Sequence, residues 1–135
     1  MPLLTWNDAY SVGVKEIDTQ HQKIFELINQ LYNAIVNSRE KQIINSVIND
    51  LIDYANYHFS TEESYFAKFH YPDKDLHEQK HLEYRKKVNE FKENSAQNNE
   101  ALSQEVLTFL EKWWTNHVIE IDKKYTKFFN DQGLI

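Results

Sequence analysis

Apolar residues recur through most of this chain at intervals of three and four, as in helices that bury one face. The pattern predicts four helices, at about residues 18–37, 39–66, 73–93 and 100–129. Residues 1–17 lack it and are expected to form an extended N-terminal arm, with Asp18 as the N-cap of the first helix. Because short connections favour antiparallel neighbours, we expect an all-α fold, an up-down-up-down antiparallel four-helix bundle.

The segments between the predicted helices have the residues expected of breaks and turns. Pro72 disfavours a helical conformation at Tyr71, which separates the second helix from the third. Residues 94–99 are polar and predict a turn before the fourth helix. With 135 residues and only two glycines and two prolines, the chain is expected to form a single domain, residues 1–135.

Composition and charge exclude several classes of function. A net charge of −6 provides no basic surface for nucleic acid. No apolar run approaches the length of a membrane span, and the first residues lack the regions of a signal peptide. The absence of cysteine excludes disulfides, iron–sulfur clusters and zinc–thiolate sites. We expect a cytoplasmic protein that binds neither nucleic acid nor a membrane, and we expect it to be a monomer.

Five of the six histidines and two carboxylates occupy positions that the predicted bundle brings together. His58 and Glu62 are four residues apart, as are His77 and His81, so each pair shares a helix face. Antiparallel helices place all of these groups at one end of the bundle, facing inward. The candidate metal ligands are His21, His58, Glu62, His77, His81, His117 and Asp122.

A purely structural polar cluster is the alternative to a metal site, since a single core histidine is usually satisfied by a hydrogen bond. Glu62 argues against that alternative, because a carboxylate among apolar residues has to be paired or ligated. His70 has no partner at helical spacing and is expected at the surface. Asp122 lies about 140° around an ideal helix from His117, so Glu120 is the better-placed carboxylate unless a π-type widening brings Asp122 round. Spacing alone leaves this choice open.

The ligand types favour iron, although nitrogen and oxygen donors without thiolate could also hold zinc, manganese or copper. Seven protein ligands are too many for one ion, so we expect two. Five imidazoles, two bridging carboxylates and one bridging oxygen fill all but one position of two six-coordinate ions. A single vacancy suits a small molecule that binds end-on.

The ligand series resembles hemerythrin, specifically the single-domain bacteriohemerythrins. The resemblance covers nearly the whole chain and rests on His21, the segments His58–Glu62, His77–His81 and His117–Asp122, Trp6 in the arm, and Gly13–Asp18. It implies a four-helix bundle with two non-heme iron ions and a bridging oxo or hydroxo group, which binds dioxygen reversibly.

The resemblance also implies a role for each ligand. His77, His81 and His117 would hold the coordinatively full iron, and His21 and His58 the iron with the vacancy. Glu62 and Asp122 would bridge, which decides between Asp122 and Glu120 on family grounds only. Four apolar residues next to ligands in sequence are the candidate pocket walls: Phe59, Trp113, Trp114 and Val118. Relatives often carry leucine where Trp114 stands.

Three functions compete, and we favour reversible dioxygen binding for carriage, storage or delivery over catalysis. A ferritin-like oxidase or peroxidase builds its site from glutamates and paired Glu-x-x-His motifs, and this chain has no such pair on facing core helices. A sensor of oxygen, redox state or iron would need a partner for its output, because few residues follow the fourth helix. A carrier could instead supply an oxygen-consuming client protein.

Overall fold

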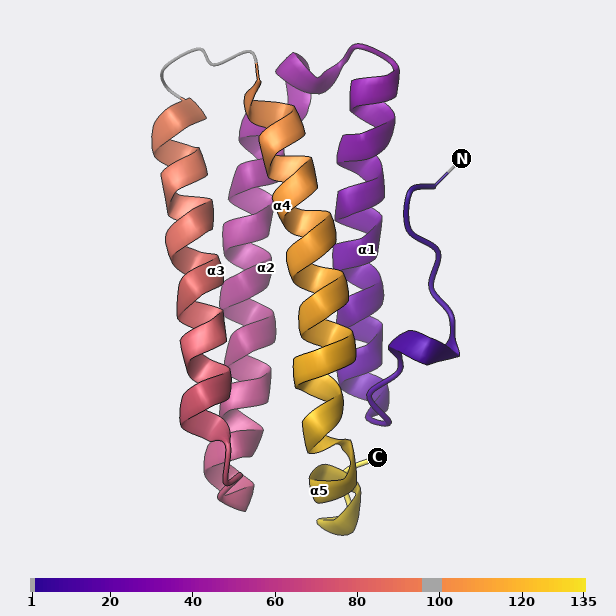
Figure 1. Ribbon diagram of the computed structural model, residues 1–135, viewed down its shortest axis with the longest axis vertical. Coiled ribbons are helices and arrows are strands. Elements are labelled where there is room, and N and C mark those ends of the chain that lie inside the picture. Colours follow the sequence, from indigo (N-terminus) through magenta and orange to yellow (C-terminus); the bar gives the residue numbers. More distant parts are fainter. Residues whose placement is uncertain (1, 96–100) are drawn as a thin grey trace.

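A computed structural model describes residues 2–95 and 101–135 of the chain. Within these residues four long helices run antiparallel to their neighbours (Figure 1), and none of the residues is in a β-strand. The helices are α1 (Lys15–Val36), α2 (Glu40–Phe69), α3 (Lys74–Ser95) and α4 (Leu102–Asn116). The predicted all-α, up-down-up-down bundle is confirmed. The predicted turn at 94–99 and helix start at residue 100 fall mostly on residues outside the described part of the chain.

The bundle core is formed by the apolar stripes that the sequence predicted. In α1 the stripe residues Ile17, Ile24, Ile28 and Leu31 are fully buried. Burying an aliphatic side chain of this size contributes roughly 1.5–3 kcal/mol, so a stripe of four outweighs the intrinsic helix propensities. In α3, the most polar helix, the buried positions include Tyr84, Val88 and Phe91.

The N-terminal arm packs against the bundle and is joined to α1 by side-chain hydrogen bonds. The backbone N–H and C=O of Leu4 both bond to the side-chain amide of Asn29, each at 2.8 Å. The arm includes a short 3₁₀ helix, η1 (Asp8–Tyr10). The prediction that Asp18 caps α1 was wrong, because the helix begins earlier and Val14 is its N-cap. Asp18 instead accepts hydrogen bonds from the backbone N–H of Val12 (2.8 Å) and the hydroxyl of Ser11 (2.6 Å).

The fourth helical segment changes its winding where the candidate ligands begin, so the expected uninterrupted helix up to residue 129 is not observed. After α4 the chain forms a π-helical turn, η2 (His117–Ile121), a 3₁₀ turn, η3 (Asp122–Tyr125), and a short helix, α5 (Thr126–Asp131). These turns lie at the end of the bundle where α1 and α3 start and α2 ends (Figure 1).

The connection between α2 and α3 also lies at this end. His70 ends α2 with a left-handed backbone (φ 56°), and the N–H of Tyr71 bonds back to the carbonyl of Phe66 at 2.9 Å. His70 is exposed, as its lack of a partner at helical spacing predicted. None of the described helices combines the length and apolar character that crossing a membrane requires.

Candidate metal centre

The seven predicted ligands converge at one end of the bundle, where each is at most 3% exposed. They form two groups of donor atoms, each spanning no more than 4.8 Å, and Glu62 belongs to both. One group consists of Glu62, His77, His81 and His117, and the other of His21, His58, Glu62 and Asp122. Every one of the four helical segments contributes at least one donor.

The two carboxylates lie between the imidazoles and face both groups. Oδ2 of Asp122 is 2.9 Å from Nε2 of His21, whereas Oδ1 is 2.8 Å from His77 and 2.9 Å from His117. Oε1 of Glu62 is 3.1 Å from Nε2 of His81 and 3.4 Å from that of His58. This arrangement suits two cations that share both carboxylates.

The π-helical turn explains how Asp122 reaches this position. The backbone N–H of Asp122 bonds to the carbonyl of His117, five residues earlier, so the wider turn carries Asp122 round to the face of His117. Asp122 is fully buried, whereas Glu120 is exposed on the outside of the turn. Sequence spacing left open whether Glu120 or Asp122 joins the cluster. The π-helical turn places Asp122 there.

The donor atoms fit metal ions because the protein itself leaves them without hydrogen bonds. Among the described residues, the buried atoms that lack a hydrogen-bond partner include Oε1 of Glu62, Nε2 of His77, His81 and His117, and both carboxylate oxygens of Asp122. Buried polar atoms are normally paired, since an unpaired one costs about 1–3 kcal/mol. Such a concentration of unpaired nitrogen and oxygen donors is what a site for two borderline or hard cations requires.

The ionisation of the cluster also suits cations. Burial lowers the pKa of His58 to about 3, which keeps this imidazole neutral. Burial also acts to lower the pKa of His81, but the carboxylates of Glu62 and Glu63 outweigh it and raise the pKa to about 9. Burial and the nearby carboxylate of Asp122 act to raise the pKa of Glu62, yet the neighbouring imidazoles hold it below its ordinary value. A metal ion would replace the protons that balance the carboxylates, so metal and proton binding compete.

Comparison with known proteins identifies the family of this site. Residues 12–129 match the family model described as the hemerythrin HHE cation binding domain. The chain belongs to the hemerythrin family. The sequence resemblance is thereby confirmed over the segment that carries every candidate ligand.

Relatives and solved structures agree with this assignment. The chain is 34% identical to a bacteriohemerythrin of Stenotrophomonas maltophilia, with 93% of this chain and 80% of that protein covered. It is 32% identical to a bacteriohemerythrin of Clostridium acetobutylicum, with 91% and 98% covered. A crystal structure of wild-type hemerythrin superposes with a TM-score of 0.83 at 27% identity, covering 93% of this chain and 96% of that one.

Three residues that the sequence reasoning missed hold the candidate ligands of this hemerythrin in place. Oε1 of Gln20 lies 2.6 Å from Nδ1 of His58, and Oε2 of Glu63 lies 2.8 Å from Nδ1 of His81. The buried hydroxyl of Tyr125 donates a hydrogen bond of 2.5 Å to Oε2 of Glu62. Gln20 and Glu63 each stand beside a ligand in sequence, and Tyr125 follows Asp122 by three residues, but spacing alone does not identify their partners.

The four predicted wall residues are all buried or partly buried beside the candidate ligands, and two of them, Trp114 and Phe59, lie near imidazoles of both halves of the site. The fully buried ring of Trp114 lies 5.7 Å from that of His58 and 6.4 Å from that of His21. Phe59 instead stacks on His81 at 3.8 Å, and Trp113 stacks on His117 at 4.2 Å. The fourth residue, Val118, is fully buried.

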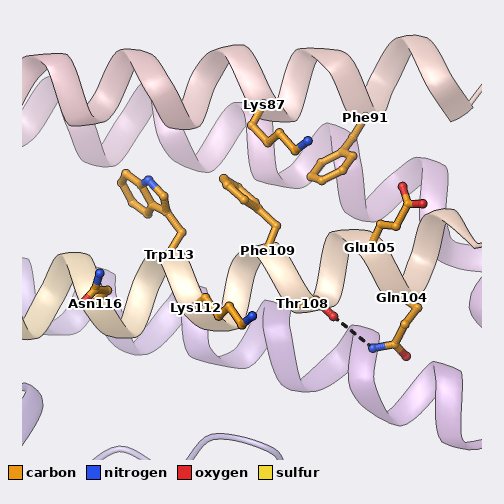
Figure 2. A pocket seen from close by; sticks show the side chains of 9 residues that line it. All are labelled: Lys87, Phe91, Gln104, Glu105, Thr108, Phe109, Lys112, Trp113 and Asn116. Carbon is orange, nitrogen blue, oxygen red and sulfur yellow. Dashed lines mark hydrogen bonds between the residues drawn. The ribbon is translucent and has the colours of Figure 1, made fainter.

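Trp113 lies between the imidazole of His117 and an open groove between α3 and α4. The groove encloses about 610 Å³, and Figure 2 shows Trp113 and Phe109 pointing from α4 towards Lys87 and Phe91 on α3. A second groove, of about 470 Å³, is lined in part by His77. Aromatic rings thus stack on imidazoles in both halves of the site, but only the His117 and His77 side lies beside these grooves, since neither groove is lined by His21 or His58.

Proposed function

We propose that this hemerythrin binds dioxygen reversibly at two non-heme iron ions held by the seven clustered side chains, and that it does not turn over a substrate. The observation that carries the proposal is the pair of overlapping donor groups, each no wider than 4.8 Å, with Glu62 common to both. Five imidazoles against two carboxylates favour binding over oxidase chemistry, for which carboxylate-rich sites are typical.

In this proposal His77, His81 and His117 would hold one ion, His21 and His58 would hold the other, and Glu62 and Asp122 would contribute to both. The division is supported by Asp122, whose Oδ1 faces His77 and His117 while its Oδ2 faces His21. The chain would thus offer one protein ligand fewer on the side of His21 and His58, which is the side where a small molecule would bind.

The bound iron would supply two electrons to dioxygen and recover them when dioxygen leaves. The chain provides a site in which that exchange can reverse. Neutral imidazoles would add no further charge to two buried cations that the two carboxylates partly neutralise. The buried ring of Trp114 lies beside the rings of His21 and His58, where it would keep water from that side of the cluster. The hydroxyl of Tyr125 already donates its hydrogen bond to Oε2 of Glu62, so its proton is directed at that carboxylate and not at the open side of the site.

The test is repeated oxygenation and deoxygenation of one iron-loaded sample. Elemental analysis after iron-replete expression should find two irons per chain. The reduced protein should gain a visible absorption band under oxygen and lose it when the oxygen pressure falls, without added reductant. If most sites become ferric within the first cycle, or if the metal is stoichiometric zinc, the proposal is wrong.

A pair of histidine variants tests which residues hold the metal. His77→Ala removes a donor from the cluster and should reduce the iron content. His70→Ala is the matched control, because His70 is exposed and lies outside both donor groups. Loss of iron in the control and not in His77→Ala would overturn the ligand assignment.

A further inference from the structure

Two of the clustered imidazoles have different acceptors on the nitrogen that faces away from the site. Nδ1 of His81 lies 2.8 Å from a carboxylate oxygen of Glu63, and Nδ1 of His58 lies 2.6 Å from the amide oxygen of Gln20. The amide nitrogen of Gln20 donates to the hydroxyl of Thr61 at 3.2 Å, which is consistent with its oxygen facing His58. Both Nδ1 atoms therefore carry a proton, and each imidazole turns its Nε2 towards the cluster, where Nε2 of His58 lies 3.1 Å from that of His21 and Nε2 of His81 lies 3.1 Å from Oε1 of Glu62.

The two imidazoles are otherwise held in similar ways. Phe59 stacks on His81 with ring planes 8° apart, and Tyr54 stacks on His58 with planes 18° apart. The hydroxyl of Tyr54 also donates to the backbone carbonyl of Gln20 at 2.5 Å. The clearest difference between the two environments is thus chemical, a charged acceptor on one imidazole and a neutral acceptor on the other.

The solvent exposure of the two acceptors explains why only the acceptor of His81 is charged. The side chain of Glu63 is 30% exposed, so water can solvate its carboxylate while one oxygen accepts from His81. Gln20 is only 7% exposed, and a carboxylate in its place would be a buried charge. The fold thus provides a solvated position for an anion beside His81 and an amide-sized, buried position beside His58.

We propose that Glu63 is a positioning residue that makes the His81 half of the site the more electron-rich half. A carboxylate that accepts the Nδ1 proton strengthens the imidazole as a donor through Nε2 and fixes its tautomer and orientation. A stronger donor favours the higher oxidation state of the metal it binds. This inference rests on the ligand assignment proposed above, and it assigns the more readily oxidised position to the group of His77, His81 and His117.

Two variants of Glu63 separate its charge from its shape. Glu63→Gln keeps an acceptor of the same length without the charge, and Glu63→Ala removes both. Asp53→Asn is the matched control, because Asp53 is an exposed carboxylate on the same helix and its substitution removes the same charge. The readouts are cobalt(II) affinity of the metal-free protein and the reduction potential of the iron-loaded protein.

We expect Glu63→Ala to weaken cobalt(II) binding by about 10–100-fold and Glu63→Gln by about tenfold, the range typical of partners behind a metal ligand. The reduction potential should rise in Glu63→Gln and stay unchanged in Asp53→Asn. A residue that only supports the structure would leave the potential of Glu63→Gln where it is in the unaltered protein.

The result for the unaltered protein distinguishes this inference from the proposed function. If that protein fails to bind two metal ions, the ligand assignment fails and this inference fails with it. If it binds two ions and Glu63→Gln matches Asp53→Asn in affinity and potential, only the role of Glu63 is overturned.

Discussion

Asp122 concentrates the chemistry of the site in one residue, because its two oxygens face imidazoles from α1, α3 and the π turn. Burial would favour its protonated form, but His117 and the other imidazoles hold the pKa of this carboxyl well below its ordinary value. The group is therefore ionised inside the bundle, where a lone charge would be strongly unfavourable. In the metal-loaded protein, the bound cations have to stabilise this buried negative charge.

Asp122→Asn should therefore reduce iron content more than any change at Glu120. An amide cannot bridge two cations with two anionic oxygens, so we expect metal affinity to fall by at least about tenfold. Glu120→Gln removes a carboxylate from the same turn but from its exposed side, and iron content should not change. Metal analysis with far-ultraviolet circular dichroism checks both variants. Equal iron content in the two variants would contradict the bridging role of Asp122.

At the scale of the elements, the site depends on where helices end and how they wind. The i,i+4 spacing of His58 with Glu62 and of His77 with His81 predicts their shared faces, because an α-helix is regular. The place of Asp122 could not be decided in this way, since a π turn differs from an α turn by one residue that periodicity does not reveal. The roles of Gln20, Glu63 and Tyr125 depend on contacts between helices and were likewise beyond local patterns.

Removing the metal should loosen these elements and leave the opposite end of the bundle intact. Without cations the carboxylates lose their partners, and the π turn has fewer interactions to maintain its widened geometry. Amide exchange should accelerate at His58–Glu62, His77–His81 and His117–Asp122, with little change around Ile48 and Val88. Hydrogen exchange measured with and without iron provides the comparison. Uniform acceleration along every helix would show instead that the metal stabilises the whole bundle.

At the scale of the whole molecule, folding, metal binding and proton binding are linked through the same imidazoles. In the metal-free protein the pKa of His58 is lowered to about 3 by burial, whereas its ordinary value is 6.5. The unfolded chain then binds more protons between these values, so stability rises with pH across this window. The pKa of His81 is raised from 6.5 to about 9, so the folded protein binds more protons there, and stability falls as pH rises through that window.

The metal-free protein should therefore be most stable near pH 6.5, where these two opposite dependences meet. Each group contributes a slope of up to about 1.4 kcal/mol per pH unit, which urea unfolding at a series of pH values can resolve. His81→Gln should remove the decline on the alkaline side and keep the decline on the acidic side. Iron loading should remove the alkaline decline as well, because Nε2 of His81 then binds a cation in place of a proton. A metal-free protein whose stability rose steadily through pH 9 would show that His81 is neutral in the folded state.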